Sequence, residues 1–113
     1  GNFDALYSLD VLEHIDPKDE DAFLRNTADS LRNGGVAIIG MPSLESQSYA
    51  SPQSKEGHVN CKSGNVLKST LEKYFDNVFI FSMTFFNNVL DHTVSIPVFT
   101  LKNSHRLLIF KRN

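Results

Sequence analysis

The feature that most constrains the fold is an unbroken apolar run, Val36-Ala37-Ile38-Ile39-Gly40-Met41, which follows two glycines directly and ends at Pro42. A run without polar alternation is typical of a parallel strand that is covered on both faces. The residues before it have helical spacing, because Leu24, Ala28 and Leu31 recur at i, i+4 and i+7. A helix that leads into a buried strand predicts an α/β protein.

Capping residues suggest where the helices begin and end. Asp16-Pro17 predicts the start of the first helix. Aspartate caps the free N–H groups of a first turn, and proline, which has no N–H, forfeits no helical hydrogen bond at the first position. Arg32-Asn33-Gly34-Gly35 predicts its end, with glycine in the left-handed cap. Ser63 predicts the start of a second helix. The expected inward face of that helix consists of Val66, Leu67, Thr70, Leu71, Tyr74 and Phe75.

Strands are expected over residues 3–8, 36–41, 77–83 and 107–110. The first three are expected to be parallel, with helical crossovers, and the last, which no helix precedes, to be antiparallel. We expect a single domain over residues 1–113. The segment 43–62 is rich in Ser, Gln, Gly and Pro and has no periodicity, so we expect a long loop that is either a functional lid or locally disordered.

Composition excludes several classes of protein. The hydrophobic fraction of 41% and the charged fraction of 21% are those of an ordinary globular chain. A net charge of -2 argues against a nucleic-acid partner. The sequence holds no apolar run of about 18 residues, so we expect no membrane span. The single cysteine, Cys61, lacks a base partner in sequence and predicts an inert thiol in a reducing, cytoplasmic setting.

Three segments resemble motifs of the class I S-adenosylmethionine-dependent methyltransferases, in particular their type 11, 12 and 23 branches. Phe3–Ile15, FDALYSLDVLEHI, resembles the fourth-strand motif, in which Phe-Asp and apolar residues precede Val-Leu-Glu-His. Leu31–Val36 resembles the Leu-x-Pro-Gly-Gly turn into the fifth strand, with Asn33 in place of proline. Gly57–Asn60 resembles a histidine segment that precedes the next helix. The resemblance implies a partial Rossmann-like sheet with strands equivalent to the fourth to seventh and two main helices.

One family motif is absent from the sequence. The methyltransferases carry a Gly-x-Gly-x-Gly loop after their first strand, where glycines let the backbone approach the cofactor, and this sequence has none. The acidic residue that ends the family's second strand is missing as well. The resemblance therefore implies the C-terminal half of a methyltransferase, and the Gly1 start suggests a cut end or a tag remnant. We expect this chain alone to be inactive and to bind S-adenosylmethionine poorly.

The resemblance also implies a cofactor-binding role for the turn that follows the first strand. In the family, the residues equivalent to Ser8, Leu9 and Asp10 line the methionine part of S-adenosylmethionine, largely through backbone groups. In open α/β sheets, ligands bind at the carboxyl ends of the strands, which agrees with this role. The alternative is a plain turn between a strand and a helix.

Two further groups can carry chemistry. Asp10, Glu13 and His14 lie at i, i+3 and i+4 and can ligate a divalent cation, as the equivalent cluster does in some quinone-biosynthesis O-methyltransferases. The alternative, which we favour, is that Glu13 and His14 bond to backbone and to the following helix, with no metal. His58 can act as general base toward an acceptor hydroxyl, or can be a loop histidine bonded to a carbonyl.

The expected partner is a small-molecule methyl acceptor with an O, N or C nucleophile. Tyr49 can cover it, and the apolar residues of the last connection can shape its pocket or form a satellite hydrophobic cluster: Phe85, Phe86, Val89, Leu90 and Phe99. An alternative function is a non-catalytic, methyltransferase-like module. Because an unpaired strand edge recruits partners, we expect the edge of strand 3–8 to form a homo-oligomer or to pair with another chain.

Overall fold

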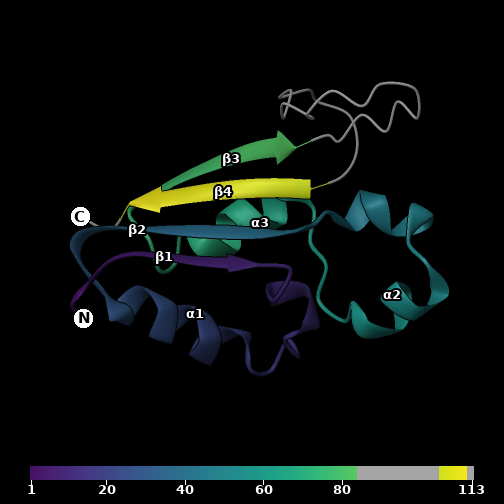
Figure 1. Cartoon of the computed structure of the whole chain (residues 1–113), viewed down its shortest axis with the longest axis horizontal. Coiled ribbons are helices and arrows are strands. Elements are labelled where there is room, and N and C mark those ends of the chain that lie inside the picture. The colour runs from purple at the N-terminus through teal and green to yellow at the C-terminus, as the bar shows by residue number, and fades with distance from the viewer. Residues whose placement is uncertain (84–104, 112–113) are drawn as a thin grey trace, which may run out of the picture.

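The computed structural model describes residues 1–83 and 105–111. Its elements are β1 (Phe3–Leu9), the 3-10 helix η1 (Leu12–His14), α1 (Glu20–Ser30), β2 (Leu31–Pro42), the 3-10 helix η2 (Leu44–Tyr49), α2 (Pro52–Gly57), α3 (Gly64–Leu71), β3 (Asn77–Met83) and β4 (His105–Lys111). The strands form one sheet in the order β1-β2-β4-β3 (Figure 1). β1 and β2 are parallel, and β4 is antiparallel to both of its neighbours. The predicted α/β class is confirmed.

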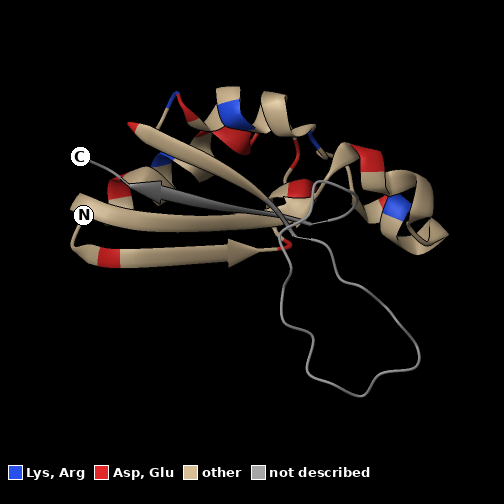
Figure 2. Ribbon diagram, turned by 90° about the horizontal axis from the view of Figure 1, so that it is seen from above, with Lys and Arg blue, Asp and Glu red and all other residues tan. Residues whose placement is uncertain are grey.

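α1 and α3 pack on the same face of the sheet (Figure 2). Between them and the sheet lies the core, in which the predicted Leu24, Ala28 and Leu31 are all buried. The other buried apolar residues are Leu12, Ala37, Ile39, Met41, Leu67, Leu71 and Phe75. Between Gly35 and Ile39 of β2 the buried positions alternate with half-buried ones, since a strand points successive side chains to opposite faces, and the last residues of the strand are all buried. No described helix is long and apolar enough to cross a membrane.

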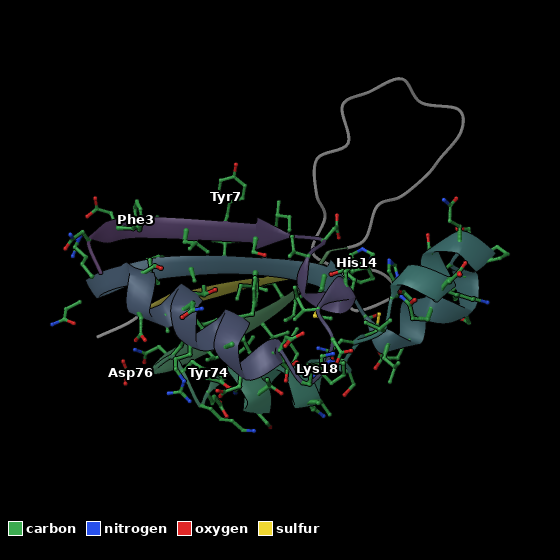
Figure 3. All side chains as sticks on the ribbon, turned by 90° about the horizontal axis from the view of Figure 1, so that it is seen from below. Phe3, Tyr7, His14, Lys18, Tyr74 and Asp76 are labelled. Carbon is green, nitrogen blue, oxygen red and sulfur yellow. The ribbon has the colours of Figure 1, made fainter. Side chains whose placement is uncertain are left out.

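The opposite face of the sheet carries no helix among the described residues. Phe3 and Tyr7 of β1 project from it and are largely exposed (Figure 3). In β2, Val36 and Ile38 are only half-buried. The expectation that strand 36–41 is covered on both faces is therefore wrong for the described part of the chain, because both α1 and α3 lie on the other side.

The first helix begins later than its capping signal predicted. The Asp16 carboxylate accepts a hydrogen bond from the Lys18 N–H at 3.0 Å, and the Asp16 carbonyl accepts one from the Asp19 N–H at 2.8 Å. These bonds form a separate turn, and α1 begins at Glu20. Asp16 thus caps a turn that is not continued into the helix, so the predicted start was wrong by one turn.

The predicted end of that helix was also wrong. α1 ends at Ser30, and Leu31 is already extended. Gly34 has a φ of 76°, but it lies inside β2, where the register slips between the pairs Phe3–Leu31 and Ala5–Val36. Glycine is needed here because the bulge, and not a helix cap, requires the left-handed conformation.

The segment 43–62 is not a structureless loop, so that prediction was wrong. It contains η2 and α2, and serine side chains cap both. Ser43 Oγ accepts from the Ser46 N–H at 3.2 Å, and Ser51 Oγ accepts from the Ser54 N–H at 3.1 Å. The serine-rich composition that indicated a loop supplies these caps. Ser63 caps α3 as predicted.

The inward face of α3 follows the prediction only in part. Leu67 and Leu71 are buried in the core, and Phe75 is buried just beyond the helix. Val66 is 53% exposed, so its assignment to the inward face was wrong. Strand 77–83 has the predicted bounds, with Phe79 and Phe81 exposed on the face away from the core.

Candidate metal centre

The polar cluster of interest lies where β1 and β2 end. Asp10, directly after β1, has a φ of 52°, and its N–H donates to the Gly40 carbonyl of β2 at 2.9 Å. A positive φ is uncommon in residues other than glycine and marks a sharp change of chain direction. The turn leads at once into η1, so the carboxyl edge of the sheet and η1 are adjacent. Ligands of open α/β sheets bind at this edge.

Glu13 is a fully buried acidic residue on η1. Neither carboxylate oxygen has a hydrogen-bond partner among the described residues. Burial raises the pKa of Glu13 above its usual range, and the nearby Asp10 charge raises it further, whereas His14 and His58 lower it. A buried carboxylate without donors is costly, so the site favours a cation or a proton next to Glu13.

His14 presents one ring nitrogen to Glu13. Its Nε2 lies 3.7 Å from Glu13 Oε1, while its Nδ1 lies 2.7 Å from the Gly57 carbonyl oxygen. Because a carbonyl only accepts, Nδ1 carries a proton, and in the neutral form of the ring Nε2 holds the lone pair that a metal ion needs. Figure 3 labels this side chain just beyond the end of β1. A carbonyl bond at the far nitrogen is the arrangement that orients metal-ligating histidines.

His58 completes the cluster from the end of α2. Its Nδ1 lies 2.9 Å from Gln47 Oε1 of η2. Its ring meets the His14 ring edge to face, with centroids 4.9 Å apart and an interplanar angle of 68°. Donation from Nδ1 to the amide oxygen leaves Nε2 available to a ligand.

The ligand atoms of Glu13, His14 and His58 lie within 4.8 Å of one another. One carboxylate and two imidazoles suit divalent ions such as Zn²⁺, Mn²⁺, Co²⁺ or Fe²⁺ better than Mg²⁺ or Ca²⁺, which prefer oxygen. The unpartnered oxygens of Glu13 fit such an ion. Asp10, which the sequence places beside Glu13 and His14, does not belong to this cluster of described residues. His58, treated from the sequence as a separate base, does.

No protein-family model matches this sequence, and no curated protein matches it. Its fold is similar to that of a SAM-dependent methyltransferase from Thermotoga maritima, described as a possible histamine N-methyltransferase, with a TM-score of 0.74 and 15% sequence identity. The two proteins share their fold over the matched region, which covers 98% of this chain and 56% of that chain. This chain therefore spans little more than half the length of the methyltransferase it matches.

The turn Ser8-Leu9-Asp10 lies at the carboxyl end of β1, the outermost strand on one side of the described sheet. Ser8 Oγ is buried without a hydrogen-bond partner among the described residues, and Leu9 is half exposed. The backbone N–H of Asp10 is already bonded to the end of β2. The hydrogen bond to β2 therefore holds the backbone of this turn in place, next to the cluster that contains Glu13.

The remaining predicted residues supply no ligand atom to the cluster or lie outside the described chain. Tyr49, on η2, is 80% exposed. Burial raises the pKa of the Cys61 thiol, and the Glu13 charge raises it further, as expected for an inert cysteine. The predicted pocket residues Phe85, Phe86, Val89, Leu90 and Phe99 lie outside the described residues.

Sequence reasoning missed the residues that support the cluster. Gln47, Gly57, Asn60 and Lys62 all lie in the segment interpreted as a loop. The only available signal was the histidine segment Gly57–Asn60, whose resemblance to the family could have linked it to Glu13 and His14.

Proposed function

We propose that this chain is part of an S-adenosylmethionine-dependent methyltransferase that acts on a small-molecule acceptor. Two observations support the proposal. The fold is a methyltransferase fold, and a buried, unpartnered carboxylate with two oriented imidazoles lies at the carboxyl edge of its sheet. The second observation carries most weight, because buried titratable groups with perturbed pKa values gather at functional sites, and this edge of an open α/β sheet is where ligands bind.

We propose that β1, β2, β3 and β4 correspond to the fourth, fifth, sixth and seventh strands of the family. The order β1-β2-β4-β3, with an antiparallel strand inserted between two others, supports this assignment. Under it, the turn Ser8-Leu9-Asp10 faces the methionine part of the cofactor. The sequence has no Gly-x-Gly-x-Gly loop, so we expect this chain alone to bind S-adenosylmethionine weakly and to be inactive.

Glu13, His14 and His58 are the residues that would hold a divalent cation. When bound, such an ion polarises an acceptor oxygen and lowers its pKa, which makes it a better nucleophile for the methyl group. The chain's own contribution is orientation: the Gly57 carbonyl and Gln47 fix the two rings, and η1 aims the Glu13 carboxylate at them. Without an ion, the free Nε2 of His58 can accept the acceptor's proton.

Metal binding by the chain and by two variants tests this proposal. Isothermal titration with Mn²⁺, Co²⁺ and Zn²⁺ is expected to show one site, weakened at least tenfold in Glu13→Gln. Glu72→Gln, which removes an exposed carboxylate directly after α3, is the matched control and should bind as the unmodified chain does. Equal affinity in all three proteins would overturn the metal assignment.

Transfer itself needs a separate assay. The full-length protein, incubated with methyl-labelled S-adenosylmethionine and a panel of phenols, catechols and amines, is expected to label one acceptor class. Micromolar binding of S-adenosylmethionine by this chain alone would contradict the expectation of a weak cofactor site.

A second candidate function is a non-catalytic module that pairs through the β1 edge. One observation favours it: β1 ends the described sheet, and Phe3 and Tyr7 on it are 64% and 77% exposed. Exposed edge strands with apolar side chains recruit other strands. We therefore propose self-association along β1 as an alternative that the oligomeric state tests.

A further inference from the structure

A second polar network lies beside the Glu13–His14–His58 cluster and supplies none of its ligand atoms. Asn60, only 6% exposed, donates from Nδ2 to Glu20 Oε1 at 2.9 Å. Lys62 Nζ donates to Asn60 Oδ1 at 3.1 Å and lies 2.8 Å from Glu20 Oε1. The three side chains thus form a closed ring of contacts in which each touches the other two.

This network joins two distant segments of the chain. Glu20 is the first residue of α1, which follows η1, whereas Asn60 and Lys62 follow α2. The backbone N–H of Asn60 also donates to the Glu13 carbonyl at 2.9 Å. Asn60 is two residues from His58, so the network is anchored directly between the main chain of Glu13 and the imidazole that faces it.

Stability alone does not explain the network. The Lys62 and Glu20 side chains are 12% and 18% exposed, so both charges have lost most of their hydration. A buried ion pair gains little net stability over apolar residues of similar size, because desolvation offsets the attraction. Such a pair can instead fix the relative position of the two segments that carry it. If the segments moved apart, both buried charges would lose their partners, which is costly.

We propose that Glu20, Asn60 and Lys62 are positioning residues, which hold His58 opposite Glu13 and His14. Asn60 is two residues from His58 and bonds through its backbone N–H to the Glu13 carbonyl, and Lys62 is two residues further along the chain. The contacts of His14 with Gly57 and of His58 with Gln47 orient the two rings. The Glu20–Asn60–Lys62 network sets the distance between the segments on which those rings stand. Where it concerns metal affinity, this inference rests on the proposed function.

Charge exchange in the full chain tests the proposal. Glu20→Lys and Lys62→Glu each create a like-charge pair, whereas the double variant restores opposite charges, and the Asn60 amide can turn over to serve the exchanged pair. The same exchange at Lys68 of α3 and Glu72 directly after it, an exposed pair 3.7 Å apart, is the matched control. Lys62→Met, which keeps the buried stem, replaces the single variants if charge reversal prevents folding.

The first readout is made without metal. Ring-proton cross-relaxation between His14 and His58 is expected in the unmodified chain, because their centroids are 4.9 Å apart. It should fall at least threefold in the single variants and in Lys62→Met, return in the double variant, and stay unchanged in the Lys68/Glu72 control. Unchanged cross-relaxation in folded single variants would overturn the proposal.

The second readout is affinity for Mn²⁺ or Zn²⁺ alone. Supporting residues around metal ligands typically contribute 10- to 100-fold in affinity, so we expect a loss of about that size in the single variants and recovery in the double variant. If the unmodified chain binds no metal but cross-relaxation changes as described, the metal assignment fails and the positioning role stands. If the chain binds metal and every variant binds equally, the positioning role fails.

Discussion

His14 Nδ1 lies 2.7 Å from the carbonyl oxygen of Gly57, which is 43 residues further along the chain. A Cβ atom on Gly57 would lie 3.3 Å from both Cε1 and Nδ1 of the same ring. Glycine therefore lets the end of α2 approach the imidazole closely enough for the bond to form. The same approach, together with the bond from the Asn60 N–H to the Glu13 carbonyl, brings His58 close to Glu13.

Gly57→Ala should disturb the cluster more than the fold. The added methyl group meets the His14 ring at a distance tighter than ordinary van der Waals contact, so the ring must move by a few tenths of an ångström. We expect metal affinity to fall at least tenfold, because ligand geometry is set by such supporting contacts. The free energy of unfolding should fall by only about 1 kcal/mol, the usual scale for a mild overpacking change. Isothermal titration and urea unfolding measure the two effects.

Lys55→Ala is the control for this substitution, because it alters an exposed side chain of the same short helix. It should change neither metal affinity nor unfolding. If Gly57→Ala and Lys55→Ala bind metal equally well, the close approach of Gly57 has no bearing on the cluster.

The sequence predicted the sheet and the helical layer well, and the site only in pieces. The burial of Leu24, Ala28 and Leu31 could be predicted because the helical repeat is a local pattern, visible in residues three and four positions apart. The meeting of His58 with Glu13 depends on the path of residues 43–62, and composition says nothing of that path. Gly34 illustrates the same limit, because glycine marks a left-handed residue without telling a helix cap from a β-bulge.

Metal should stabilise the chain, and Glu13→Gln should remove the effect. A ligand that binds only the folded state adds about 2.7 kcal/mol at a concentration 100 times its Kd. We therefore expect Zn²⁺ or Mn²⁺ to raise the melting temperature of the unmodified chain, but not of Glu13→Gln. Thermal unfolding with and without a chelator measures this. Equal metal-induced shifts in both proteins would show that the ion binds elsewhere.

The metal-free chain should lose stability as pH rises through the titration of Glu13. Burial raises the folded-state pKa of Glu13 above the ordinary value of 4.5. The folded state therefore holds this proton more tightly than the unfolded chain does. The contribution is fully present below about pH 4.5 and is lost as pH rises through the raised pKa. Glu13→Gln should flatten this part of the profile. Urea unfolding in chelator between pH 4 and 8, compared with Glu72→Gln, tests the sign; a Glu13→Gln profile parallel to that of the unmodified chain would refute it.

Self-association along β1 should depend on the exposed apolar side chains of that strand. Tyr7 is 77% exposed, and Figure 3 shows it projecting from the sheet face that carries neither α1 nor α3. A lysine on an edge strand opposes strand pairing, because its charge would have to be desolvated between the paired strands. We expect Tyr7→Lys to shift the chain from dimer to monomer in light scattering at high concentration. Tyr49→Lys removes an equally exposed tyrosine from η2 and should leave the mass unchanged. If the unmodified chain is monomeric under the same conditions, the pairing function is refuted. The methyltransferase function with a metal site at Glu13 is then the proposal that stands.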